Sequence, residues 1–176
     1  MKKHPIILDV DTGFDDAFAV LFAAQSEEVN LLGITCVDGN THVHQVVKNT
    51  FKVLDAAGAG DIPVAMGATR PLVEEPLYAE HIHGADGMGD LGLPESQRKL
   101  DPRSAIELLR DLIEESAEPV TLVPVAPLTN IANFINGNGD WVGDMTGPEG
   151  EEHYRKWQKT HQALTNTFDN DIIMLL

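Results

Sequence analysis

Four aspartates within eight residues are the first side chains in this sequence that could do chemistry: Asp9, Asp11, Asp15 and Asp16. The apolar run 6–8 leads into them and predicts a short buried strand. Gly13 then allows a tight turn, and a second apolar run, 17–24, predicts a helix that Asp15 and Asp16 begin. The acids therefore gather where a strand gives way to a helix, which is the edge at which α/β folds bind ligands.

Crowded carboxylates repel one another and lose hydration when they are buried together. A hard cation such as Ca²⁺ or Mg²⁺ relieves that repulsion, because both ions prefer carboxylate oxygens. The competing interpretation is a solvated turn whose acids lie favourably at a helix N-terminus. That interpretation accounts for Asp15 and Asp16, but poorly for Asp9 and Asp11, which end an apolar strand and would be partly buried. The residues therefore favour a metal site.

Two other aspartate patterns match this stretch less well. Counted from Asp9, an EF-hand loop requires a glutamate where Val20 stands, so that interpretation fails. The haloacid-dehalogenase phosphatases place two aspartates one residue apart after their first strand, so Asp9 and Asp11 would be nucleophile and acid/base. Gly13 stands where those proteins have threonine, and the following Asp-Asp pair is unexplained. A phosphohydrolase of this kind remains an alternative.

Apolar runs of strand and helix length alternate along most of the chain. Further strands are predicted over 29–37, 63–66 and 120–125, and further helices over 43–54, 101–113 and 127–134. Asp101 and Pro102 are expected to cap and start the second of these helices. The stretch 67–100 is rich in Gly and Pro and predicts a long irregular loop. The alternation predicts a single α/β domain over 1–176, with a Rossmann-like, mostly parallel sheet flanked by helices.

Length and charge limit the classes of function. A chain of 176 residues is long enough for one domain with a real core. Its net charge of −16 disfavours nucleic acid and anionic membranes as partners. The only cysteine, Cys36, lies in an apolar run, where a buried inert thiol is expected. No apolar run is long enough to cross a bilayer, and the N-terminal one is too short for a signal peptide. A cytoplasmic protein is expected.

Four ordered motifs resemble those of the nucleoside hydrolases, the inosine-uridine preferring nucleoside N-ribohydrolases. The acidic stretch 9–17 is similar to that family's signature. The others are Gly33-Ile-Thr with Asp38-Gly-Asn40, the His-rich loop 81–89, and the strand and turn 122–132. Each motif alone is weak, but four in order over residues 5–132 make a specific match. The resemblance implies the N-terminal half of the nucleoside hydrolase fold. It also implies hydrolysis of the N-glycosidic bond of ribonucleosides to free base and ribose, as in purine and pyrimidine salvage.

The resemblance also implies Ca²⁺ as cofactor. By position, the carboxylates of Asp11 and Asp16 and the backbone carbonyl of Val125 would be metal ligands. The family often has threonine at position 125, and a carbonyl ligand tolerates valine there because the side chain does not coordinate. Asp11 would also be the general base toward the attacking water, a role that a positioned carboxylate can fill.

The remaining matched residues would contact the small-molecule ribonucleoside. Asp15 and Asn40 would hold ribose hydroxyls, and His83 would lie near the departing base. Each also has a simpler interpretation: Asn40 as an ordinary turn residue, and His81 and His83 as solvated side chains of a Gly-rich loop. Asp9 is expected to be structural, with its carboxylate bonded to the loop backbone.

The resemblance fades after Ala132, so residues 1–135 are family-like and 136–176 diverge. The Asn, Glu and Asn group that grips ribose in the family has no counterpart in 133–159, and the chain stops before the family's His-Asp pair. We therefore expect a truncated or internally deleted member, with a non-catalytic remnant that binds metal or a partner as the alternative. An exposed sheet edge and apolar surface would favour a homo-oligomer. An amphipathic helix is expected over 151–164.

Overall fold

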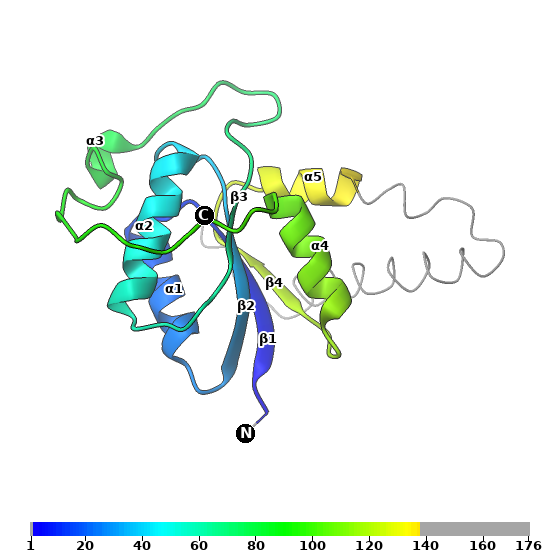
Figure 1. Cartoon of the computed structure of the whole chain (residues 1–176). Helices are drawn as coiled ribbons and strands as arrows, with labels where there is room; N and C mark the ends of the chain where they lie inside the picture. Colours follow the sequence, from blue (N-terminus) through cyan, green and yellow to red (C-terminus); the bar gives the residue numbers. More distant parts are fainter. Residues whose placement is uncertain (1, 138–176) are drawn as a thin grey trace.

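The predicted strands lie side by side in one parallel sheet (Figure 1). The computed structural model describes residues 2–137. Within them the strands are β1 (His4–Val10), β2 (Val29–Cys36), β3 (Val64–Met66) and β4 (Thr121–Pro124). Their order across the sheet is β3-β2-β1-β4, and each neighbouring pair runs parallel. The predicted Rossmann-like sheet is confirmed.

This strand order creates a topological switch point between β1 and β4. The chain runs outward from β1 to β2 and β3, and then returns to the opposite side of β1 as β4. In open α/β sheets, ligands bind outside the carboxyl ends of the strands at such a point. The acidic turn follows β1 directly, so the fold places the four aspartates there.

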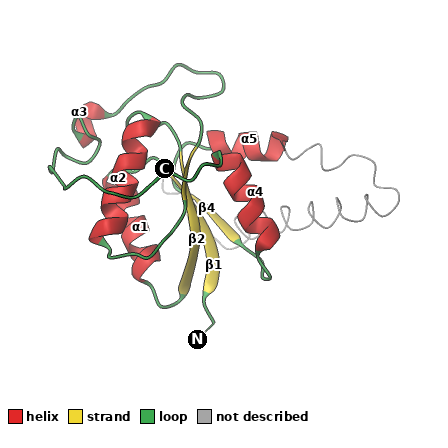
Figure 2. Ribbon diagram, viewed as in Figure 1, coloured by secondary structure: helices red, strands yellow, loops and turns green. Residues whose placement is uncertain are grey.

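Helices cover both faces of the sheet (Figure 2). They are α1 (Phe14–Gln25), α2 (Val43–Ala56), α3 (Glu80–His83), α4 (Ala105–Glu115) and α5 (Thr129–Gly137). The pair α1 and α2 packs on one face and the pair α4 and α5 on the other, while α3 lies beyond the start of α2 (Figure 1). The result is a three-layer arrangement, the expected solution for a parallel sheet that is apolar on both faces.

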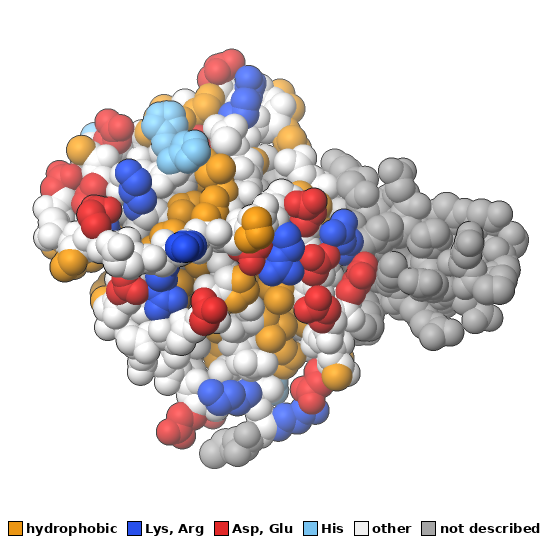
Figure 3. Space-filling view, in the orientation of Figure 1, with side chains coloured by type: hydrophobic (Ala, Val, Ile, Leu, Met, Phe, Trp, Pro, Cys, Tyr) orange, Lys and Arg blue, Asp and Glu red, His pale blue; other side chains and the backbone are white. Residues whose placement is uncertain are grey.

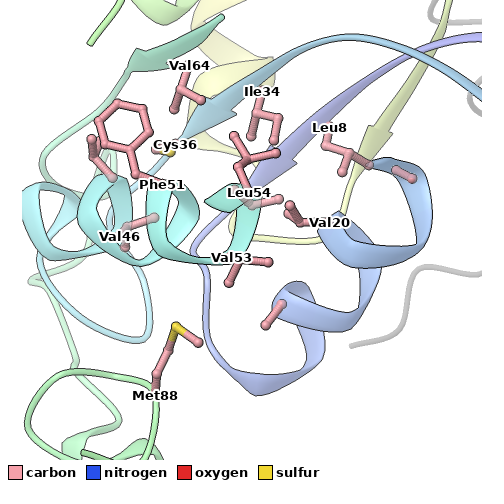
Figure 4. Packing of buried hydrophobic residues seen from close by; sticks show 14 of the residues in the cluster. Leu8, Val20, Ile34, Cys36, Val46, Phe51, Val53, Leu54, Val64 and Met88 are labelled. Carbon is pink, nitrogen blue, oxygen red and sulfur yellow. The ribbon is translucent and has the colours of Figure 1, made fainter. Parts of the chain in front are cut away.

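The core between α1, α2 and the sheet is made of the predicted apolar stripe of α2 and residues of three strands (Figure 4). The residues predicted to line that stripe are all buried: Val43, Val46, Val47, Thr50, Phe51 and Leu54. Cys36 is also fully buried here. Burial raises the pKa of its thiol to about 12, so the thiolate is absent at neutral pH, as expected for an inert cysteine.

The opposite core joins β1 and β4 to α4 and α5. Ile7, Leu109, Leu122 and Phe134 are its fully buried members. Because side chains alternate along a strand, Leu8 and Val10 face α1 and α2, whereas Ile7 faces α4 and α5. By the same alternation, the Asp9 side chain points to the α4 and α5 side, an orientation that determines its partners in the site.

The predicted start of α4 at Asp101 and Pro102 is wrong. The helix begins at Ala105, with Ser104 as its N-cap in a capping box with Glu107. Ser104 N–H donates to Glu107 Oε2 at 2.7 Å, and Glu107 N–H donates to Ser104 Oγ at 3.3 Å. Asp101 instead accepts hydrogen bonds from the backbone and guanidinium of Arg103. The Asp101 carboxylate is thus engaged by Arg103, and it lies three residues before the position that caps the helix.

The predicted irregular stretch 67–100 contains one short helix, α3, which carries His83. Arg98 holds the end of the stretch against the end of α2. Its guanidinium donates to Asp55 Oδ1 at 2.7 Å, to the Gly60 carbonyl at 2.8 Å and to the Ala59 carbonyl at 2.6 Å. The long loop is therefore tied down at this end, where it runs back across α2 to β3 (Figure 1) and Asp101 N–H donates to the Val64 carbonyl at 2.9 Å.

The helix expected over 151–164 and the segment 138–176 as a whole lie outside the described residues. Of the helices in 2–137, none is both long enough and apolar enough to cross a membrane. Acidic and basic side chains alternate over the face drawn in Figure 3. On that face, the acidic residues are interspersed with basic residues and do not form one continuous acidic patch.

Leu109→Ala should lower the free energy of unfolding by about 2–5 kcal/mol, because it leaves a cavity beneath β1 and β4. Urea denaturation followed by circular dichroism measures the change. Leu100→Ala, at a side chain that is 40% exposed, is the matched control and should shift stability by about 0.5 kcal/mol or less. Equal losses for the two variants would contradict the described core.

Candidate functional site

Three of the four aspartates are buried where β1 ends. Asp9 is 0% exposed, Asp11 7% and Asp16 1%, while Asp15 is exposed. The predicted partial burial of Asp9 and Asp11 is therefore confirmed, and Asp16 joins them. Asp15 and Asp16 lie in the first turn of α1, where the helix dipole favours negative charge.

Backbone N–H groups hold the carboxylates of Asp11 and Asp16. Asp11 N–H donates to Asp16 Oδ2 at 2.9 Å, and Asn40 N–H donates to Asp11 Oδ2 at 2.8 Å. The carboxylates of Asp11 and Asp16 thus each have a backbone donor, which favours their charged forms. The second of these bonds also connects the turn after β1 to the Asp38-Gly-Asn40 turn after β2.

Two glycines allow the acidic turn, the turn after β2 and the His-rich loop to lie in close contact. A side chain on Gly39 would overlap the Asp11 carboxylate. A Cβ on Gly13 would lie 2.7 Å from Asn40 Nδ2 and 3.1 Å from His83 Nδ1. The acidic turn, the turn after β2 and the His-rich loop therefore meet at Gly13, and the predicted Asp11, Asn40 and His83 come together.

Asp9 is held by side chains rather than by the loop backbone that the sequence led us to expect. Asp9 Oδ1 accepts from Thr35 Oγ1 at 2.6 Å and from Asn130 Nδ2 at 2.8 Å. Both partners follow from the sheet: Thr35 pairs with Asp9 in the β1–β2 register, and Asn130 lies on α5, on the face toward which Asp9 points. Asp9 Oδ2 is buried without a hydrogen-bond partner among the described residues.

Burial raises the pKa of both Asp9 and Asp16. The pKa of Asp9 is about 7, because burial outweighs the hydrogen bonds from Thr35 and Asn130. The pKa of Asp16 is about 9, because burial and then the adjacent Asp11 carboxyl disfavour its charge. These are the shifts expected where carboxylates converge away from water. Perturbed carboxyls in one place are also typical of functional sites.

His83 lies over the acidic turn, whereas His81 is exposed. Its Nδ1 is buried and has no hydrogen-bond partner among the described residues. Its ring also faces the Phe14 ring, with centroids 6.1 Å apart and planes tilted by 31°. His83 is thus half-buried with one ring nitrogen facing inward, whereas the solvated interpretation fits His81.

Val125 follows β4 beside the acidic turn. Its N–H donates to the Asp9 carbonyl at 3.0 Å, so it continues the β1–β4 pairing by one residue. The structure thus places Val125 at the switch point next to the aspartates, as its proposed role requires. The direction of its carbonyl stays a prediction.

Sequence reasoning missed two buried asparagines, Asn130 and Asn49, each 1% exposed. Asn130 Nδ2 also donates to the Cys36 carbonyl at 3.0 Å, and its Oδ1 accepts from Ala68 N–H at 2.8 Å. Its side chain therefore joins β1, β2 and the start of the long loop. Asn49 stands three residues after Val46, on the buried stripe of α2, and a polar residue at such a position is a detectable signal.

The donor chemistry of the site fits a hard cation in part. No three acidic, histidine or cysteine side chains within residues 2–137 are close enough to form a metal-binding group by themselves. The oxygens of Asp11 and Asp16, together with the unpartnered Asp9 Oδ2, are nonetheless of the type that Ca²⁺ prefers. Ca²⁺ takes about six to eight oxygens, so the described residues supply part of such a shell.

Comparison with known proteins identifies the class that this fold and site belong to. The family model "Inosine-uridine preferring nucleoside hydrolase" matches residues 6–144. The chain belongs to that family. The haloacid-dehalogenase alternative is set aside, because the match includes all four motifs.

Among curated relatives, the chain is 42% identical over 133 residues to the pyrimidine-specific ribonucleoside hydrolase RihA of Photobacterium profundum, covering 76% of this chain and 43% of that one. It is 49% identical over 133 residues to the inosine-uridine preferring nucleoside hydrolase of Leishmania major, covering 74% and 42%. Among solved structures, it is similar to a purine-preferring ribonucleoside hydrolase from Gardnerella vaginalis, with a TM-score of 0.71 and 33% identity over 76% of this chain and 43% of that one. The chain thus spans less than half the length of these relatives.

The raised pKa values make stability depend on pH. Asp9 titrates near 3.8 when unfolded and near 7 when folded, and Asp16 extends the window to about 9. Inside this window the folded state keeps protons that the unfolded state has lost. In a chelating buffer, the free energy of unfolding should therefore fall as pH rises from about 4 to 9. Asp9→Asn should reduce the slope between pH 4 and 7, as urea titrations would measure. A slope unchanged by Asp9→Asn would contradict the assignment.

Proposed function

We propose that this chain carries the nucleophile-activating half of a Ca²⁺-dependent ribonucleoside hydrolase site. The observation that supports the proposal most is the convergence of Asp11, Asp16, Asn40 and His83 at the β1–β4 switch point. The reaction class is hydrolysis of an N-glycosidic bond, giving free base and ribose. The names of the relatives, which include pyrimidine-specific and purine-preferring enzymes, support the reaction and leave the preferred base open.

Asp11 is the proposed general base. It directly follows β1, and its Oδ2 accepts a hydrogen bond from the Asn40 N–H. This bond fixes the carboxylate toward the turn after β2. A carboxylate held in this way can accept the proton of an attacking water. It also places negative charge where the departing base leaves an oxocarbenium-like sugar, and such charge stabilises the transition state.

Asp15 and Asn40 are the proposed ribose contacts. Asp15 is exposed at the start of α1, next to the buried Asp16, and Asn40 is half-buried after β2. Both can therefore reach a ligand outside the carboxyl edge of the sheet. A carboxylate and an amide together offer the acceptors and donors that sugar hydroxyls require.

His83 is the proposed contact to the departing base. Its Nδ1 is buried against Gly13, so we assign the contact with the base to Nε2. The ring is braced by Phe14 on one side. A histidine in that position can donate a hydrogen bond or a proton to a leaving nitrogen, which lowers the barrier to bond cleavage.

Asp11, Asp16 and the carbonyl of Val125 would hold the Ca²⁺ ion. Such an ion orients sugar hydroxyls and makes a nearby water more acidic. The chain's own residues support this role in two ways. Asp11 and Asp16 already converge, and their burial makes a compensating positive charge favourable.

The proposed roles of these residues predict that the chain hydrolyses ribonucleosides. The purified 176-residue chain, incubated with inosine or uridine and Ca²⁺, should release reducing sugar above a chelated control. Asp11→Ala should lower the rate by about 100-fold or more, the usual contribution of a general base. Asp61→Ala, at an exposed acid after α2, is the control and should leave the rate unchanged. No release from the unaltered chain would favour the non-catalytic alternative.

The metal can be tested without turnover. Ca²⁺ at 100 times its Kd should stabilise the folded chain by about 2.7 kcal/mol and raise its melting temperature. Asp16→Ala should abolish the rise, whereas Asp61→Ala should keep it. A melting curve that Ca²⁺ does not move would count against a formed site.

A further inference from the structure

We propose that Asn49 is a positioning residue that sets the distance between the acidic turn and His83. The inference rests on the proposed function, because it concerns the residue near the departing base. Asn49 lies on α2, outside the four family motifs, and its side chain hydrogen-bonds to Gln45, Thr12 and Asp86. Its amide nitrogen connects the acidic turn to the loop that carries His83.

The Asn49 amide donates to two backbone carbonyls that lie far apart in the sequence. Nδ2 donates to the Thr12 carbonyl at 3.2 Å and to the Asp86 carbonyl at 2.7 Å. Thr12 follows Asp11 directly, and Asp86 stands three residues after His83. One side chain on α2 therefore links the acidic turn to the loop that carries His83.

The orientation of the amide is itself fixed. Asn49 Oδ1 accepts from Gln45 Nε2 at 2.9 Å, one helical turn earlier on α2. Because the oxygen is occupied by a donor, the amide nitrogen must face the two carbonyls. Asn49 is 1% exposed, so water cannot easily replace it, and an unpaired buried carbonyl is costly.

The loop is shaped to reach this anchor. Gly87 has φ of +75°, and a Cβ there would lie 3.0 Å from Thr41 Cγ2 and 3.5 Å from Asn49 Nδ2. The next residue, Met88, is 5% exposed and reaches from the loop toward α2 (Figure 4). The segment 84–90 thus packs on α2 through a hydrogen bond and an apolar side chain, and His83 at its start is positioned by both.

Hydrogen exchange tests the bridge directly. The N–H of Gly87 donates to the Gly84 carbonyl at 3.1 Å, and that of Gly89 to the His83 carbonyl. In Asn49→Ala these two amides should exchange at least tenfold faster than in the unaltered chain, while β1 and β2 amides keep their protection. Lys48→Ala, at an exposed position of α2 next to Asn49, is the matched control and should change them less than threefold. Unchanged exchange in Asn49→Ala would overturn the proposal.

Leaving-group dependence separates positioning from general destabilisation. Asn49→Ala should lower kcat/KM for inosine at least tenfold but for p-nitrophenyl riboside less than threefold, because nitrophenolate departs without help from His83. His83→Ala should show the same pattern. Equal losses on both substrates would overturn the positioning role. If the unaltered chain hydrolyses neither substrate, the proposed function fails and the exchange experiment alone decides on Asn49.

A second variant covers the case in which Asn49→Ala does not fold. Gly87→Ala strains the positive φ of the loop and brings a Cβ within 3.0 Å of Thr41 Cγ2, while Asn49 and the rest of α2 keep their sequence. It should accelerate the Gly89 amide, which donates to the His83 carbonyl, at least tenfold and show the same dependence on the leaving group. Protection equal to that of the unaltered chain would contradict the bridge from the loop side.

Discussion

Mutual repulsion among the buried carboxylates at the end of β1 is the constraint on which the rest of the structure depends. Asp9, Asp11 and Asp16 are all nearly inaccessible, and burying charges together is unfavourable unless donors or cations compensate. The fold supplies donors from every side: Thr35 on β2, Asn130 on α5, and the backbone N–H groups of Asp11 and Asn40. The remaining charge is what a hard cation would neutralise.

Topology explains why distant segments can serve one site. With the strand order β3-β2-β1-β4, the carboxyl ends of β1, β2 and β4 meet at the switch point. Asp11, Asn40 and Val125 follow these three strands, so parallel pairing alone brings them to one edge. His83 follows no strand, and the long loop must be fixed by other means, namely Phe14 at the start of α1 and the Asn49 bridge on α2.

Local patterns predicted the sheet, the α2 stripe and the acidic turn, because strand and helix periodicity is set by burial of nearby apolar residues. They failed where partners are distant in sequence. The bond between Asp9 and Asn130 spans 121 residues, and nothing local indicates it. The start of α4 was missed because Asp101 pairs with Arg103, leaving Ser104 as the cap. The close approach of His83 to the acidic turn requires a glycine at position 13, and that of Asp11 to the turn after β2 requires one at position 39. Both glycines matter for close approach rather than for turn propensity.

Residues 2–137 bring the His-rich loop onto the acidic turn, although the chain spans about 43% of a curated relative. The most direct test is nuclear Overhauser spectroscopy on the isotopically labelled 176-residue chain. A Cβ on Gly13 would lie 3.3 Å from His83 Cε1, so the Gly13 α-protons and the His83 ring proton on Cε1 should show a strong cross-peak. Absence of that cross-peak, with the β1–β2 cross-peaks present, would contradict the assembled site.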